Sequence, residues 1–187
     1  MSSSIHTPPD STKSLLRWAQ VATLSGLAMF VLAFGYFTYA SLTDPTFFDV
    51  QLVDLFEDPN ITGPFTNLER FTAVVLMLIE DSTGILALWA SFRLFTEYRR
   101  GNIFTLTAAA RLRFIGWMVV LLTPIDMVVE TFGTALYTHW AQPGKVNISI
   151  SFEDVHVFAL VFGLVIVVVG HVMYQAIAIS DENSAFV

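Results

Sequence analysis

The stretch LMLIEDSTGIL, residues 76–86, places two adjacent carboxylates, Glu80 and Asp81, inside a long apolar run. The chain of 187 residues is 55% hydrophobic and 13% charged, whereas soluble domains average about 25% charged residues. A helix needs ~20 apolar residues to cross a hydrocarbon core of ~30 Å. Four runs are long enough, so the sequence predicts four membrane-spanning helices around residues 18–42, 68–92, 114–138 and 155–179.

The predicted fold is an all-α, four-transmembrane-helix bundle. A disordered tail is expected over 1–13 and a C-terminal tail over 181–187, with the helical domain over 14–180 between them. Gly101 is expected to end the second helix, and Thr105 or Thr107 to cap the third. The expected helix bounds, in chain order, are 15–42, 68–96, 107–138 and 154–180.

An outer cap is also expected. Residues 146–152, VNISISF, alternate strictly between apolar and polar side chains, a pattern typical of a short strand. This strand could pair with part of the acidic and aromatic loop over 43–67. We therefore expect a small extracytoplasmic cap that includes a short β-hairpin.

The basic residues predict the topology. Seven of the nine lie before the first helix or between the second and third helices, and only Arg70 and Lys145 lie elsewhere. By the positive-inside rule that side is cytoplasmic. We expect a multi-pass protein of the bacterial inner membrane with both termini in the cytoplasm.

Several kinds of site are not expected. The chain has no cysteine, which excludes disulfides and thiolate ligands. His156 and His171 lie on one helix without the two further membrane histidines that a bis-histidine pair of haems needs. No Glu-x-x-His pair of the di-iron type and no catalytic spacing is present. We expect neither an enzyme nor a cofactor or metal site, and His156 is interpreted as an interfacial residue beside Glu153 and Asp154.

Several segments resemble a known family. They are RGNIF (100–104), RLRFIGW (111–117), SISF (149–152) and the ending DEN (181–183) with Phe186 and Val187. In order and spacing, residues 85–187 resemble the small four-helix prokaryotic membrane proteins of the domain-of-unknown-function 2975 family. The resemblance implies no established activity. It does imply a regulatory partner, because members are often encoded beside a small helix-turn-helix regulator.

The intramembrane acids are predicted to gather on facing sides of their helices. At about 100° per residue, Glu80 lies on a stripe of small residues, with Asp81 at its margin. Asp126 and Glu130 share a face of the third helix, and His171 lies on the fourth. No Lys or Arg is expected at this depth to neutralise them. Because a buried charge in a bilayer costs free energy, the four carboxyl groups cannot all stay ionised. At least two are expected to be protonated near neutral pH.

The predicted depths of these groups in the membrane are similar, which would allow them to meet. Counted from the cytoplasmic arginines at ~1.5 Å per residue, Asp81 and Asp126 lie ~18–20 Å deep. His171, counted from Asp181, lies ~15 Å deep. The groups could therefore meet near the bilayer midplane. Three interpretations stay open: an interhelical hydrogen-bond network, a proton or cation site, and a transition-metal site.

The cytoplasmic loop also has two interpretations. Its arginines could set the topology and bind anionic lipid headgroups. They could instead form a docking surface for a partner, with residues Arg99, Arg100, Phe104, Arg111 and Arg113. Direct binding of nucleic acid is not expected on so small a patch.

The sequence favours a non-enzymatic accessory or regulatory membrane protein that acts through this loop. Its partner would be a small helix-turn-helix regulator or another membrane subunit. The alternative is a small proton- or cation-responsive or -conducting protein that uses Glu80, Asp81, Asp126, Glu130 and His171.

Overall fold

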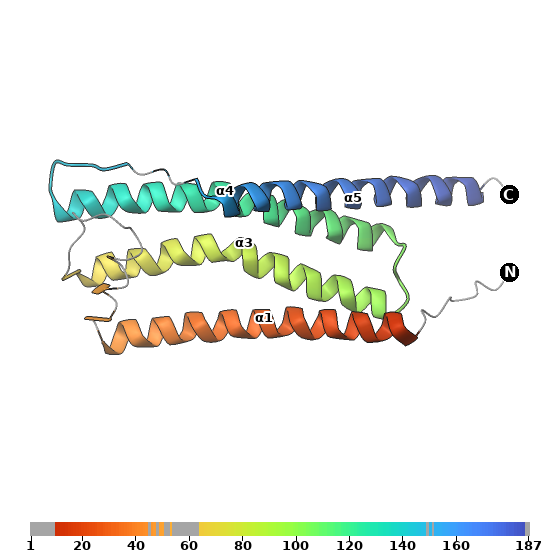
Figure 1. Cartoon of the computed structure of the whole chain (residues 1–187), viewed down its shortest axis with the longest axis horizontal. Coiled ribbons are helices and arrows are strands. Elements are labelled where there is room, and N and C mark those ends of the chain that lie inside the picture. Colours follow the sequence, from red (N-terminus) through yellow and green to blue (C-terminus); the bar gives the residue numbers. More distant parts are fainter. Residues whose placement is uncertain are drawn as a thin grey trace.

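The computed structural model describes residues 10–44, 46–47, 49–50, 53, 64–148, 150 and 152–185. Within them the chain forms four long helices (Figure 1): α1 (Asp10–Thr43), α3 (Asn67–Arg99), α4 (Leu106–Ala141) and α5 (Asp154–Ala185). All four are long and apolar enough to cross a membrane. The prediction of a multi-pass membrane protein with four helices is therefore confirmed.

The helix ends follow from local side-chain chemistry. Thr66 caps α3 in a capping box, in which Oε2 of Glu69 accepts the Thr66 N–H at 2.5 Å. After α3 the backbone turns at Gly101, whose φ of 86° favours glycine. Thr105 then caps α4, because its Oγ1 accepts the Ala108 N–H at 3.2 Å. The expected roles of Gly101 and Thr105 are confirmed.

Two helices run further than expected. α1 begins at Asp10, so residues 10–13 form its first turn, although they were expected in the tail. α5 continues to Ala185, through most of the expected C-terminal tail. The remainder of both tails, 1–9 and 186–187, lies outside the described residues.

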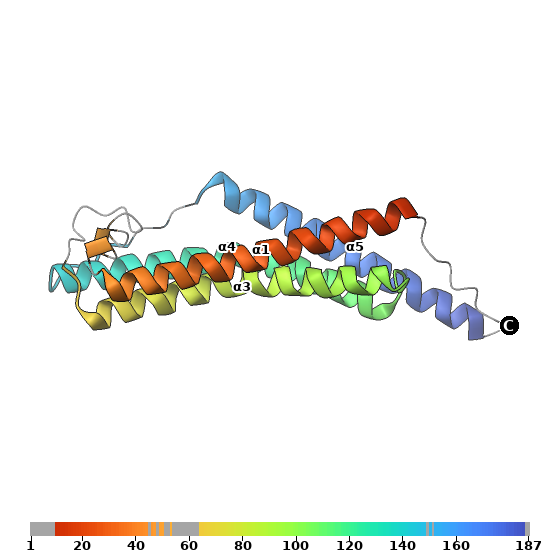
Figure 2. The ribbon, with the colours of Figure 1, turned by 90° about the horizontal axis from the view of Figure 1, so that it is seen from below.

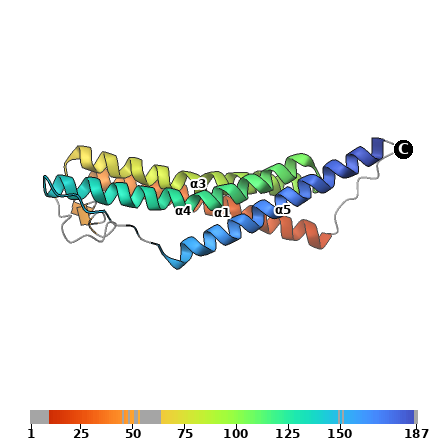
Figure 3. The same cartoon turned by 90° about the horizontal axis from the view of Figure 1, so that it is seen from above.

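The helices pack in chain order, with α1 against α3, α3 against α4 and α4 against α5 (Figure 1). α5 is displaced relative to α4 along the direction of the helix axes. It starts beside the middle of α4 and extends past the beginning of α4 at the other end. Figures 2 and 3 show that it also runs obliquely to the other three helices. This displacement decides which side chains of α5 meet those of α4.

Glycines form the contact between α4 and α5. A Cβ added to Gly116 would lie 2.6 Å from the backbone N of Val167, and one added to Gly163 would lie 2.8 Å from that of Val120. Real Cβ atoms do not come so close, so the two backbones touch where only glycine fits. Small residues allow this kind of close approach between membrane helices. The crossing therefore fixes the register of α5.

Two buried apolar clusters hold α3 against α4. Near one end lie Phe65, Ala73, Leu76, Val129 and Tyr137. Near the other end lie Ala90, Leu94, Ala108 and Ile115. The polar residues Thr83 and Thr123, only 4% and 3% exposed, lie between the two clusters. The interface thus has a polar middle between two apolar ends.

The expected β-hairpin cap is not found. Among the described residues there is no strand, and those of 142–153 run without regular structure after α4. Val146, Ile148 and Ile150 are 61–66% exposed, so the alternation does not mark a paired strand with one buried face. Ile148 and Ile150 instead line an apolar groove on α4. Most of the loop over 43–67, which was expected to supply the second strand, lies outside the described residues.

Candidate functional site

The polar middle of the α3–α4 interface carries two carboxyl groups. Glu80 of α3 and Asp126 of α4 come within hydrogen-bonding range of each other. Two carboxylates in this contact would repel each other, and a shared proton turns the repulsion into a hydrogen bond. The pair is therefore expected to hold at least one proton.

Two further acids lie near this pair. Asp81 and Glu130 are both close enough to act on Glu80 electrostatically. Asp81 lines the same cavity as Glu80 and Asp126, whereas Glu130 is not among the lining residues. The structure thus brings Glu80 near the three other acids that the sequence singled out, and Asp126 is the one within hydrogen-bonding range of it.

His156 completes the group from α5. Its ring is buried, and its Nε2 lies 2.5 Å from Oδ2 of Asp126. Its Nδ1 accepts the backbone N–H of Glu153 at 2.8 Å. An imidazole nitrogen that accepts a hydrogen bond carries no proton, so the neutral ring must hold its proton on Nε2. His156 therefore donates to Asp126, and Asp126 accepts.

The group, which we call the Glu80–Asp126–His156 cluster, lies in a cavity of about 290 Å³. All four helices contribute to the lining: Phe30 from α1, Gly84 from α3, Leu122 and Thr123 from α4, and Val155 and Ala159 from α5, besides the acids and His156. Thr123 also donates to the backbone carbonyl of His156 at 3.2 Å. A change in this cavity can therefore reach every helix.

His171 does not join the cluster. A Cβ on the neighbouring Gly170 would lie 2.7 Å from the backbone N of Arg113, and the side chain of His171 is exposed. His171 is thus level with the basic end of α4. The expected depth was counted from Asp181, which lies inside α5 because the helix continues to Ala185. The register places His156, which sequence reasoning had assigned to the interface, where His171 was expected.

The start of α5 also fixes the position of the cluster along the helices. His156 lies in the first turn of α5, directly after the exposed residues Glu153 and Asp154. The cluster is therefore at the end of the fourth span, although it is near the middle of α3 and α4. Its predicted position at the bilayer midplane stays a prediction.

The described residues show no group arranged to bind a metal ion. In the part of the chain that the structure describes, no group of three or more His, Asp or Glu side chains has the geometry to hold a metal ion. The geometry instead pairs Glu80 with Asp126, and Asp126 with His156.

The arginines around the α3–α4 connection have different partners. Arg99 donates to Oε1 of Gln20 on α1 at 2.5 Å. Arg100 and Arg111 both approach Glu97, at 3.5 and 3.4 Å. Arg113 lies over the ring of Tyr174, 5.4 Å from its centroid. Phe104 is 79% exposed. Whether the five residues act as one docking surface stays a prediction.

Sequence reasoning missed two features of these regions. One is His156, for which the spacing Glu153-x-x-His156 at a helix start was a usable signal, because a third helical residue often bonds the capping residue. The other is the approach of Lys13 and Arg17 on α1 to Arg99 on α3. That approach follows from the antiparallel packing of α1 on α3.

Comparison with known proteins places the chain in a family without assigning an activity. No curated protein matches the chain, and no solved structure matches it. A family model described as "Protein of unknown function (DUF2975)" matches residues 54–187. The match extends beyond the segment that carries the resemblance in the sequence, since it includes α3 with Glu80 and Asp81. It covers more than half of the chain, so the protein belongs to the DUF2975 family.

Proposed function

We propose that this chain is a non-enzymatic membrane protein that responds to protons at the Glu80–Asp126–His156 cluster. One observation carries the proposal: three titratable side chains from three helices are joined in one cavity that all four helices line. Ionisable groups are costly inside a membrane and commonly mark proton relays. The accessory role that the sequence favoured is compatible with such a response.

The cluster supplies a mechanism for the response. With one proton shared between Glu80 and Asp126, and one on Nε2 of His156, every polar group has a partner. A second proton on the imidazole would occupy Nδ1 and break its bond from the Glu153 N–H. Loss of the shared proton would set two like charges against each other across the α3–α4 interface. Both acid and alkali are therefore expected to loosen the start of α5 or its neighbours.

Hydrogen exchange tests this proposal. We expect amide protection in residues 153–160 to pass through a maximum as pH is varied in reconstituted protein, after correction for the intrinsic exchange rate. In His156→Gln the acidic side of this dependence should disappear, because glutamine does not titrate. The matched control is His171→Gln, an exposed histidine on the same helix. A pH dependence unchanged in His156→Gln would contradict the proposal.

Proton flux separates a responsive protein from a conducting one. A pH gradient across proteoliposomes would collapse through a conducting protein and persist across a merely responsive one. We expect a response without conduction. Flux that is abolished by Glu80→Gln would instead support the conducting alternative.

A second candidate function is the docking of a partner at the basic end of the bundle. This end carries Arg99, Arg100, Arg111 and Arg113, around the connection between α3 and α4. The observation that favours docking is an exposed apolar surface. Phe104 is 79% exposed, and together with the C-terminal half of α5 it lines an apolar groove of about 580 Å³. A small helix-turn-helix regulator or a membrane subunit would be the partner. In this case Arg99→Glu with Arg100→Glu should release the partner from native membranes, whereas Glu80→Gln should retain it. The reverse sensitivity would favour the proton response alone.

A further inference from the structure

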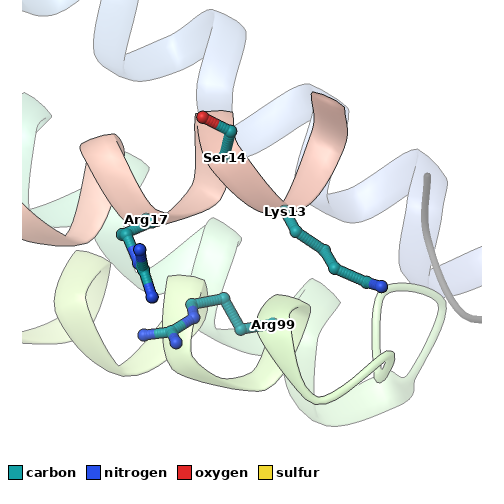
Figure 4. A pocket seen from close by; sticks show the side chains of 4 residues that line it. All are labelled: Lys13, Ser14, Arg17 and Arg99. Carbon is teal, nitrogen blue, oxygen red and sulfur yellow. The ribbon is translucent and has the colours of Figure 1, made fainter. Parts of the chain in front are cut away.

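A second pocket lies at the basic end, remote from the cluster. It has a volume of about 370 Å³ and is lined by Lys13, Ser14 and Arg17 of α1 and by Arg99 of α3 (Figure 4). Three of its four lining residues are cationic. Figure 4 shows the side chains of Arg17 and Arg99 extending toward each other from the two helices. The pocket therefore collects positive charge from parts of the chain that are distant in sequence.

Arg99 is held in place by a buried polar side chain. Gln20 is only 7% exposed and accepts from Nη1 of Arg99 at 2.5 Å, while its own Nε2 donates to Oγ1 of Thr96 at 2.7 Å. Both hydrogen-bonding ends of the Gln20 amide are thus used. This arrangement fixes the Arg99 guanidinium beside the pocket and leaves its remaining N–H groups as donors.

Among the described residues, no carboxylate neutralises the positive charge at Arg17 and Arg99. Across the described residues, the ion pairs of arginine are Arg70 with Asp49, and Arg100 and Arg111 with Glu97. Neither Arg17 nor Arg99 has a carboxylate partner there. Two guanidinium groups turned toward one cavity repel each other unless an anion lies between them. The pocket is therefore complementary to a compact anion.

We propose that this pocket binds the phosphate group of an anionic ligand, with Arg17 and Arg99 as the main ligands and Lys13 as a further cation. Guanidinium groups donate two parallel hydrogen bonds to phosphate oxygens, so a pair of arginines suits this anion. The hydroxyl of Ser14 supplies a neutral donor at the wall. This site is independent of the proton response proposed above.

The surroundings favour a lipid headgroup as the source of the phosphate. Leu15 and Trp18, on the same turns of α1, are each 69% exposed. Tryptophan beside basic residues is characteristic of the membrane–water interface. Headgroup phosphates lie at this level, and basic pockets at the ends of membrane helices bind them.

Calorimetric titration of the full chain in a neutral detergent tests the site. The probes are dioctanoyl phosphatidylglycerol, dioctanoyl phosphatidylcholine as the zwitterionic comparison, and inorganic phosphate alone. We expect the anionic lipid to bind more tightly than phosphatidylcholine. Arg17→Gln should weaken its binding roughly tenfold, the scale of a lost hydrogen bond to a charged group. Arg100→Gln, a neighbouring arginine outside the pocket, should change it little.

Further measurements distinguish a lipid phosphate from a free phosphate ion and check that the variants are folded. Inorganic phosphate that binds tightly in an Arg17-dependent manner would support the same site with a free anion as its ligand. Lys13→Gln provides a second variant and leaves the Arg99–Gln20 contact intact, and circular dichroism checks that both variants are folded. Equal binding of the anionic lipid by wild type, Arg17→Gln and Lys13→Gln would overturn the proposal. So would an equal loss in Arg100→Gln.

Discussion

Nε2 of His156 lies 2.5 Å from Oδ2 of Asp126, and this contact joins the first turn of α5 to the middle of α4. It exists because α5 is displaced along α4 by the glycine crossing. The same histidine ring accepts the backbone N–H of Glu153. One side chain thus caps α5 and links it to the acidic pair on α3 and α4.

The tautomer of His156 is fixed by its two hydrogen bonds. We expect Nδ1 to carry no proton and Nε2 to carry one at neutral pH, because Nδ1 accepts from Glu153. Nitrogen-15 NMR of the ring in reconstituted protein reads the two nitrogens separately. The assignment comes from the loss of the signal in His156→Gln. A ring protonated on Nδ1 at neutral pH would contradict the geometry.

Asp126 is expected to act as an acceptor for His156. Asp126→Leu leaves the buried Nε2–H without its acceptor, which costs about 1–3 kcal/mol of unfolding free energy. Asp126→Asn keeps a carbonyl oxygen at this place and should cost less. Chemical unfolding in detergent micelles measures both. Equal destabilisation by the two variants would show that the acceptor is not what matters.

The glycine crossing is expected to be intolerant of a methyl group. Gly116→Ala would bring a Cβ to 2.6 Å from the backbone of α5, so the helices must separate. We expect a loss of about 1–3 kcal/mol, typical of overpacking. Gly35→Ala is the matched control, because nothing lies within 4 Å of its added Cβ. It should be neutral or stabilising, since alanine favours helix more than glycine does. Equal effects would argue against the close crossing.

The capping box of α3 is expected to contribute to stability. Thr66→Ala removes the oxygen that accepts the Glu69 N–H at 3.4 Å, and such substitutions cost about 0.5–2 kcal/mol. Thr72→Ala is the comparison, since Thr72 donates only to the carbonyl of Leu68 within its own helix. Thermal unfolding followed by circular dichroism should rank Thr66→Ala below Thr72→Ala. The opposite ranking would contradict the cap.

The architecture could be predicted further than the site. Four helices follow from the lengths of the apolar runs, and the cap at Thr105 follows from residue type. The face shared by Asp126 and Glu130 follows from helical periodicity. The register between helices does not, because it depends on where backbones touch. The contact of Gly116 with Val167 moves α5 along α4, so His156 rather than His171 reaches Asp126.

The prediction of a strand over 146–152 is not supported, for a related reason. The alternation of Val146, Ile148 and Ile150 signals two different faces, but a strand also needs a partner that supplies hydrogen bonds. Among the described residues no such partner is present, and two of these side chains lie along a groove on α4. Periodicity describes a segment alone, whereas pairing depends on the rest of the chain.

Infrared difference spectroscopy of the reconstituted protein during a pH titration tests the central claim most directly. It detects the carbonyl stretch of protonated carboxyl groups. We predict a protonated-carboxyl signal at neutral pH that is reduced in Glu80→Gln and altered in Asp126→Asn, and that is unchanged in Glu182→Gln, an exposed acid on α5. A signal identical in wild type and Glu80→Gln, or no protonated carboxyl at neutral pH in the absence of a bound cation, would contradict the account.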